Sequence, residues 1–186
     1  MSTLDVHIHA ELVEACKQGD RLAQFRLYKL YSKAMYNICT RILGDPDAAE
    51  DALQEAFISA FRKLHTFEGR ATFGAWLKRI VVNKCLSIVS RNKMFTESLD
   101  ENMEVVEEVE DTGSILESEL NDKAVYEAIK NLPNGCRVIF TLYQLEGYDH
   151  QEIADILGVS VSTSKSQYHR AKKLLKEQLQ DIVMRH

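Results

Sequence analysis

The chain contains little of what interrupts helices or builds strands. Its 186 residues include only 2 prolines and 8 glycines, the residues that most often break regular structure. No stretch alternates apolar and polar residues like a strand with one buried face. Hydrophobic residues, 45% of the chain, recur at helical spacing, and the length is sufficient for one or two domains with cores of their own. These features predict an all-α protein.

Other absences argue against whole classes of site. The N-terminal residues form neither a signal peptide nor a membrane-spanning segment, so we expect a cytoplasmic protein without membrane insertion. The four cysteines, Cys16, Cys39, Cys85 and Cys136, lie singly among apolar residues and lack the paired spacing of a zinc site. We interpret them as buried free thiols. We expect neither a metal nor a cofactor.

The acidic residues are concentrated in one segment. A net charge of −5 argues against nucleic-acid binding, but residues 1–93 carry 14 basic and 10 acidic side chains, residues 94–122 carry 11 acidic and no basic ones, and residues 123–186 carry 9 basic and 7 acidic ones. Like charges repel, and the middle segment sustains no apolar period. The pattern predicts two mildly basic helical domains, 8–93 and 123–186, joined by a flexible acidic linker over residues 94–122.

The most informative motif lies in the C-terminal domain and predicts two helices joined by a turn. Asp149 is a good N-cap, because Glu152 three residues later can return the capping hydrogen bond. Gly158 suits the left-handed conformation that ends a helix. Ser160 or Ser162 can then cap a second helix. The sequence therefore predicts a helix-turn-helix.

The second helix of this motif carries a polar and basic face, because its polar residues are separated by steps of three and four. Such a face fits the DNA major groove, where these side chains donate to base edges and neighbouring cations bind phosphates. The alternative is an ordinary solvated face on an antiparallel helix pair. We expect DNA binding. The residues of the face are Ser162, Lys165, Ser166, His169, Arg170 and Lys173.

The N-terminal domain is predicted to contain four helices. Asp20 and Asp45 are placed to cap the second and third, while Gly19 and Gly44 follow the ends of the first and second. The predicted helices cover residues 10–18, 21–43, 46–64 and 73–93. The buried stripe expected on the second helix consists of Phe25, Leu27, Leu30, Tyr31, Met35, Ile38 and Ile42.

The outer face of the third helix is rich in acids and amides. It comprises Asp47, Glu50, Asp51, Gln54 and Glu55. Such a stripe is often merely solvated. It can also dock against a basic helix of a partner, since complementary charges set orientation and encounter rate. The residues alone leave both interpretations open.

The fourth helix combines an aromatic residue with an amide. Trp76 and Asn83 are almost two turns apart, so they point the same way, beside a loop that is flanked by Phe67 and Phe73. An aromatic wall, an amide and nearby cations can hold a base that is unstacked from a DNA strand. A tryptophan alone is more often part of a core, so this pocket needs independent support.

Four motifs occur in order along the chain: LVEACKQGD, LGDPDAAEDALQEAFISAFRKL, FEGRATFGAWLKRIVVN and LPNGCRVIFTLYQLEGYDHQEIADILGVSVSTSKSQYHRAKKLL. Together they resemble the extracytoplasmic-function (ECF) group of bacterial sigma-70-type sigma factors. The resemblance covers the chain apart from residues 94–122. It implies that residues 8–93 bind the −10 promoter element and RNA polymerase, and that residues 123–183 bind the −35 element.

The resemblance also implies roles for individual residues. The acidic stripe falls where family members contact the coiled coil of the β′ clamp, which gives as polymerase-binding residues Asp47, Asp51, Gln54 and Glu55. The loop and the fourth helix fall where the family captures a flipped −10 base, which gives Phe67, Glu68, Gly69, Arg70, Thr72, Trp76, Asn83 and Lys84. The −35-binding residues are Lys165, Ser166, His169, Arg170 and Lys173.

Two residues depart from the family pattern. Ser164 stands where valine or isoleucine usually packs the recognition helix, and the lost apolar burial is expected to cost about 1 kcal/mol. Gln167 stands where an arginine is common, which puts one phosphate contact in question.

The resemblance implies a sigma factor that directs promoter recognition and transcription initiation without covalent chemistry. Its partners would be core RNA polymerase, through the β′ clamp and the β flap, together with promoter DNA and an anti-sigma factor. The free protein is expected to be a monomer. One alternative is a stand-alone helix-turn-helix regulator that binds duplex DNA without polymerase. An enzyme with a DNA-binding tail is disfavoured, because no phosphate loop and no carboxylate pair beside a nucleophile is visible.

Overall fold

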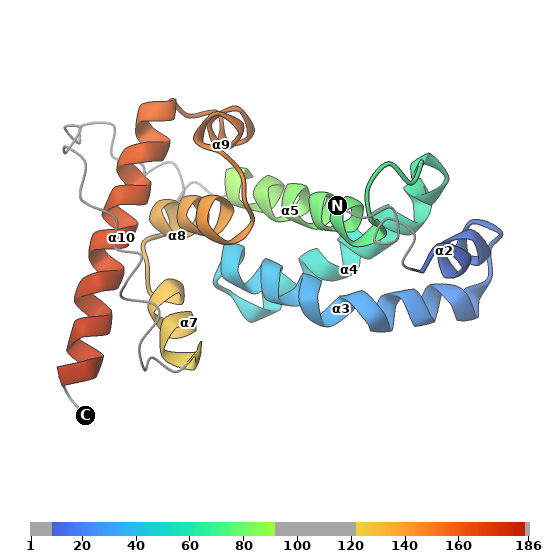
Figure 1. The fold of residues 1–186 in the computed structure, drawn as a ribbon, viewed down its shortest axis with the longest axis horizontal. Coiled ribbons are helices and arrows are strands. Elements are labelled where there is room, and N and C mark those ends of the chain that lie inside the picture. Colours follow the sequence, from blue (N-terminus) through green and yellow to red (C-terminus); the bar gives the residue numbers. More distant parts are fainter. Residues whose placement is uncertain (1–8, 92–121, 185–186) are drawn as a thin grey trace. The chain divides into compact units, whose positions relative to one another are not determined.

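The computed structural model describes residues 9–91 and 122–184, and within these ranges every regular element is a helix (Figure 1). The all-α prediction is therefore confirmed. Contacts divide the chain into two compact units between Ile88 and Val89. The predicted acidic linker, residues 94–122, lies outside the described residues except for Asp122, which opens the first helix of the second unit.

Aspartate caps define the starts of the two long helices α3 and α4 in the N-terminal unit. The Asp20 carboxylate accepts hydrogen bonds from the backbone N–H groups of Leu22 and Ala23, at 2.8 and 3.2 Å. Asp45 caps α4 in the same way, with Pro46 in the first turn. Both predicted caps are confirmed. The elements of this unit are α2 (Ala10–Lys17), α3 (Arg21–Leu43), α4 (Pro46–Lys63), the 3₁₀ turn η1 (Leu64–Thr66) and α5 (Phe73–Arg91).

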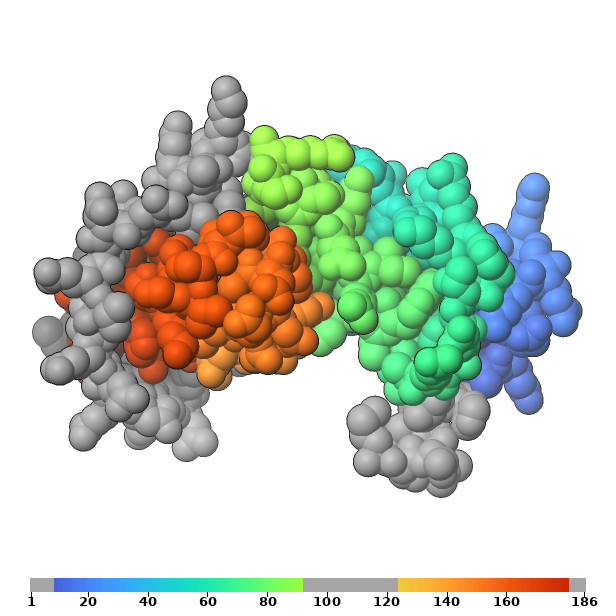
Figure 2. All heavy atoms as spheres, turned by 90° about the horizontal axis from the view of Figure 1, so that it is seen from above, coloured from blue at the N-terminus to red at the C-terminus, as the bar shows by residue number. Residues whose placement is uncertain are grey.

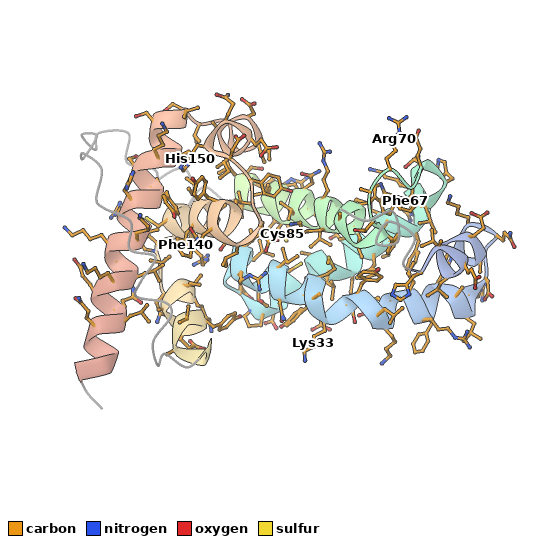
Figure 3. The ribbon with its side chains drawn as sticks, in the orientation of Figure 1. Lys33, Phe67, Arg70, Cys85, Phe140 and His150 are labelled. Atoms are coloured by element: carbon orange, nitrogen blue, oxygen red, sulfur yellow. The ribbon has the colours of Figure 1, made fainter. Side chains whose placement is uncertain are left out.

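Close contacts join α5 to α3. The rings of Tyr31 and Phe73 lie 5.2 Å apart, and a Cβ on Gly74 would lie 3.0 Å from the Tyr31 ring, so a side chain at position 74 would require that ring to shift. The thiols of Cys39 and Cys85 share a hydrogen bond between α3 and α5, where Figure 3 shows Cys85. This bond, together with burial, raises the pKa of Cys85. All four cysteines are buried free thiols, as predicted.

Two residues of the stripe predicted on α3 face solvent. Phe25 and Leu30 are 56% and 53% exposed, so their assignment to the buried face is wrong. At about 100° of rotation per residue they lie on either side of Leu27 and Ile42, at the borders of the buried face. Lys29 lies 5.6 Å from the centre of the Phe25 ring. This part of α3 therefore presents apolar and cationic side chains together.

The C-terminal unit is built around the long helix α10. Helix α8 continues directly into a π-helical turn, η2, which the sequence did not predict. The elements are α7 (Asp122–Lys130), α8 (Asn134–Phe140), η2 (Thr141–Leu145), α9 (His150–Leu157) and α10 (Val161–Met184). Helices α7, α8 and α10 share an apolar core that consists of Ala128, Ile129, Leu132, Cys136, Phe140, Ala171, Leu175 and Leu179.

A buried arginine joins α7 to α8. Arg137 is 7% exposed, and its guanidinium donates to the backbone carbonyls of Lys130 and Leu132 at 3.3 and 3.2 Å and to Asn134 Oδ1 at 2.7 Å. The last carbonyls of a helix have no partner within it, so Arg137 supplies what the end of α7 lacks. Burial lowers the pKa of Arg137, but an arginine remains charged at neutral pH.

The Asp20 cap gives a prediction for the N-terminal unit. Asp20→Ala leaves two N–H groups of α3 without their acceptor and should lower the free energy of unfolding by about 1 kcal/mol. Asp20→Ser keeps a capping oxygen and should stay within a few tenths of a kcal/mol of wild type. Urea unfolding followed by the fluorescence of the single tryptophan, Trp76, reports on this unit. Equal losses in both variants would show that the cap is not the cause.

Candidate nucleic-acid interface

Helices α9 and α10 form the predicted helix-turn-helix. The Asp149 carboxylate accepts from the Glu152 N–H at 2.8 Å, and the Asp149 N–H donates to the Glu152 carboxylate at 2.9 Å, which completes the capping box. Gly158 ends α9 with φ 68°. Of the two candidate caps of α10, Ser160 is used: its hydroxyl oxygen accepts from the Thr163 N–H at 2.9 Å. Figure 2 shows α9 and the start of α10, in orange, packed directly together.

The residues predicted to bind the −35 element lie on one side of α10. Lys165 and Lys173 are exposed, while Ser166, His169 and Arg170 are half-buried. The Ser166 hydroxyl donates to a backbone carbonyl one turn earlier, at 3.0 Å, so its oxygen remains able to accept. The face thus offers cations at both of its ends and polar groups between them, the arrangement that base and phosphate contacts require.

The two residues of α10 that depart from the family pattern are both buried. Gln167 is 1% exposed, and its side-chain oxygen accepts from Cys136 Sγ at 3.0 Å. It faces the core and does not reach a phosphate. Ser164 is 0% exposed, and its hydroxyl shares a hydrogen bond of 2.9 Å with His150 Nδ1. The apolar contact expected to be lost at Ser164 is therefore replaced by a partly buried hydrogen bond that the sequence did not reveal.

His150 connects three elements of the C-terminal unit (Figure 3). Its ring stacks on Tyr143 of η2, with centroids 4.3 Å apart and planes 15° from parallel. Tyr168 of α10 meets the same ring edge-on at 5.7 Å, and its hydroxyl donates to Gln144 Oε1 at 2.7 Å. The hydrogen bond with Ser164 is a further contact of the His150 ring with α10. Sequence reasoning missed His150, because its partners come from separate segments.

An aromatic cluster forms the predicted wall in the N-terminal unit. The ring of Trp76 lies 5.4 Å from Phe67 and 5.7 Å from Phe73. Phe73 is 1% exposed and belongs to the core, whereas Phe67 and Trp76 are half-buried and have ring surface to offer a base. Asn83 is exposed further along α5. In Figure 3 the Arg70 side chain extends away from the loop that follows Phe67.

Several residues of the proposed −10 site have partners within the loop. Thr72 Oγ1 accepts from the Ala75 N–H at 3.1 Å at the start of α5. Arg70 Nε donates to the Glu68 carboxylate at 2.7 Å, and both side chains are largely exposed. Gly69 has φ 72°, a conformation that favours glycine. These residues therefore shape the loop, and only their exposed groups remain to meet a ligand.

The acidic stripe of α4 is exposed as predicted, with Asp47, Asp51, Gln54 and Glu55 all facing solvent. Glu55 forms an ion pair with Lys84 of α5, whose side chain is 26% exposed, against 59% for that of Glu55. A residue proposed to bind polymerase is thus paired with a residue proposed to bind DNA. Sequence spacing did not reveal this pairing, because it joins two helices.

Two family models match separate parts of the chain. Residues 27–94 match the model of sigma-70 region 2, and residues 122–175 match that of sigma-70 region 4. The ECF RNA polymerase sigma-E factor of Haemophilus influenzae is 31% identical over 182 residues, which cover 92% of this chain and 95% of that protein. The chain belongs to the ECF group of sigma-70 family sigma factors.

Other relatives agree with this membership. The sigma-E factor of Escherichia coli K12 is 31% identical over 94% of this chain and 95% of its own length, and SigW of Bacillus subtilis is 29% identical over 91% and 96%. Among solved structures, the sigma factor RpoE of Bartonella quintana, in complex with the anti-sigma factor NepR, superposes with a TM-score of 0.52 at 25% identity. That match covers 83% of this chain and 95% of the other.

This sigma factor is a promoter-specific initiation factor that binds RNA polymerase, and its family consists of non-enzymatic transcription factors. The stand-alone regulator is not favoured. Within residues 9–91 and 122–184, no group of three or more histidine, cysteine or acidic side chains is placed to hold a metal. None of the described helices has the length and apolar character needed to cross a bilayer.

The Glu55–Lys84 ion pair gives a prediction about DNA binding. Glu55→Gln removes the partner of Lys84, so the free protein should bind single-stranded DNA about two- to fivefold more tightly, the range expected for an exposed ion pair. Adding Lys84→Met should abolish the gain. Asp51→Asn removes one exposed negative charge from the same helix and serves as the matched control. An equal gain in the control, measured by fluorescence anisotropy, would mean that only net charge matters.

A second prediction concerns the protonation of His150. Burial lowers the pKa of His150, electrostatic interactions with Lys165 and His169 lower it further, and Asp149 acts in the opposite direction. The folded protein therefore binds this proton less readily than the unfolded chain. The stability associated with neutral His150 is complete above pH 6.5, the ordinary histidine value, and is lost as the pH falls below it.

Urea unfolding followed by circular dichroism at pH 7.5 and pH 5.5 checks this expectation. Wild type should lose more stability between the two pH values than His150→Phe, which cannot titrate. Ionisable groups distant from His150 are common to both proteins and cancel in the comparison. The same loss in both would contradict the assignment, and the ring signals of His150 in an NMR titration would give the direction of its pKa shift independently.

Proposed function

We propose that the two units divide promoter recognition between them. The C-terminal unit binds the −35 element as duplex through Lys165, Ser166, His169, Arg170 and Lys173. The N-terminal unit binds the −10 element as an opened strand through Phe67, Glu68, Gly69, Arg70, Thr72, Trp76, Asn83 and Lys84. The exposed stripe of α4 meets the β′ clamp of the polymerase through Asp47, Asp51, Gln54 and Glu55.

One observation carries this proposal. The capped helix-turn-helix leaves the cationic face of α10 open, with Lys165 and Lys173 exposed and no acidic side chain on α10 before Glu177. The N-terminal part of the second helix in such a motif is the part that contacts base edges. A face of this composition in this position suits duplex DNA better than it suits solvent alone.

The N-terminal unit supports the second half of the proposal. Phe67 and Trp76 have partly exposed rings beside a loop, and rings in such a position stack on bases without regard to sequence. Asn83 adds an amide that can distinguish one base edge from another. Recognition and strand separation by this route use binding energy alone, so no nucleophile or metal is required.

An anti-sigma factor is a further proposed partner. The sigma factor RpoE of Bartonella quintana, which shares this fold, is held by the anti-sigma factor NepR. A partner that covers the acidic stripe of α4 would exclude polymerase from the same residues. Since polymerase and chromosome share one compartment, we also place this sigma factor in the bacterial cytoplasm.

Sequencing of transcripts made in vitro by core RNA polymerase with this protein tests the function and names the promoter. The expected result is a set of start sites that share two upstream elements and that core enzyme alone does not use. Failure of the purified chain to associate with core polymerase in size-exclusion chromatography would overturn the proposal.

Substitution of Arg170 tests the −35 assignment. Arg170→Ala removes a proposed base contact worth about 1–3 kcal/mol, so initiation at a promoter that needs its −35 element should fall by roughly 5- to 150-fold. Lys130→Ala, which removes an exposed cation from α7 of the same unit, should have little effect. Initiation rates are measured with saturating core enzyme. Equal rates for Arg170→Ala and wild type would remove α10 from the −35 contact.

Asn83→Ala tests the −10 contact separately from the −35 contact. This variant should bind closed promoter DNA normally and lose open complex at a matched −10 element, as permanganate footprinting of unpaired thymines reports. An unchanged footprint would exclude Asn83 from base capture.

A further inference from the structure

The DNA-facing half of α10 has polar residues at its buried positions. Between residues 161 and 170 only Ser164 and Gln167 are buried, and each has a side-chain hydrogen bond, to His150 and to Cys136 respectively. The buried apolar residues of α10 begin one turn later, at Ala171. In the N-terminal half of this helix both buried positions are polar, and the apolar contact with the core comes from the half-buried Tyr168, whose ring stacks on Phe140 with centroids 6.0 Å apart.

This difference matters for how α10 is oriented. Apolar contacts are non-directional and tolerate small rotations of a helix, whereas a hydrogen bond is sensitive to both distance and angle. A rotation of α10 about its axis would stretch the bond between His150 and Ser164. It would also move Lys165, the next residue along, relative to the bases.

The His150 ring is itself held in place on several sides. It follows the cap residue Asp149, so the first turn of α9 determines where it starts. Tyr143 stacks on one ring face, and Tyr168 approaches edge-on. The hydrogen bond between Tyr168 and Gln144 ties α10 to η2 beside the same ring. His150 is therefore a fixed point against which α10 can be positioned.

We propose that His150 is a positioning residue for −35 recognition: its hydrogen bond with Ser164 sets the rotation of the N-terminal half of α10, and thereby the placement of Lys165 and His169 on the bases. His150 need not touch DNA in this role. The inference rests on the proposed function of α10 and adds a residue that determines how accurately that helix discriminates.

The test compares two substitutions that separate the ring from the bond. His150→Phe keeps an aromatic ring against Tyr143 and removes the hydrogen bond to Ser164. His150→Asn removes the ring and keeps an amide near the position of Nδ1. Gln151→Ala alters the next residue of α9, whose exposed side chain donates to Asp155 Oδ1 at 3.0 Å, and is the matched control.

The measured quantity is discrimination, the ratio of holoenzyme affinities for the promoter with an intact −35 element and for the same promoter with that element scrambled. His150→Phe should lower this ratio about five- to tenfold, as expected when a buried hydroxyl loses its partner. His150→Asn should retain most of it, and Gln151→Ala should equal wild type. Affinity for the scrambled promoter should not change in any variant.

The possible outcomes are distinct. If His150→Phe discriminates as well as wild type, or loses affinity for both promoters by the same factor, the positioning role is wrong and the proposed function stands. If wild type itself does not discriminate, the −35 assignment of α10 fails and takes this inference with it. Should His150→Phe fail to fold by circular dichroism, Ser164→Ala replaces it, with the same loss of discrimination expected.

Discussion

In the positioning role proposed above, the hydrogen bonds of the buried side chains of Ser164 and Gln167 determine where the DNA-facing side chains of α10 lie. A buried polar group without a partner is costly, so these two residues allow few rotations of the helix other than the one in which both bonds form. Lys165 and Arg170 project from the same segment, and their direction follows from the direction of the bonds. The capping box of α9 matters for the same reason, because it fixes the start of the helix that carries His150. Discrimination of the −35 element by this unit thus depends on the buried polar residues close to the DNA-facing side of α10.

In the N-terminal unit, charged residues of adjacent proposed sites form ion pairs with one another. Glu55 and Lys84 are paired across α4 and α5, and Arg70 is paired with Glu68 in the loop. Each cation must leave a carboxylate before it binds a phosphate at full strength, so the free protein is expected to bind DNA less well than its basic residues suggest. In the proposed assembly, polymerase supplies a cation to Glu55, and Lys84 would then become available to DNA. Assembly on polymerase would then precede promoter opening for a local electrostatic reason.

Helix ends were predictable from the sequence, and features that join separate segments were not. Asp20 and Asp149 act within three residues of themselves, so spacing alone identified them as caps. The π-helical turn η2 and the partners of His150 depend on contacts across the fold. Periodicity also failed on α3, where Phe25 lies at the edge of the buried face, because an apolar residue there fits a core and a partner surface equally well. The candidate −35 residues share a face that local spacing defines, whereas no local signal showed that Glu55 and Lys84 meet.

The aromatic cluster limits what the protein can do by itself. Phe73 is buried in the core between α3 and α5, so Phe67 and Trp76 supply the stacking surface of the cluster. Stacking on such rings returns about 1–3 kcal/mol per captured base, and separating a duplex costs about 1.4 kcal/mol for each base-pair step. One captured base therefore offsets the opening of only one or two steps, fewer than a transcription bubble contains. The remaining free energy must come from the polymerase, which is why a protein that recognises its promoter in this way functions as a subunit.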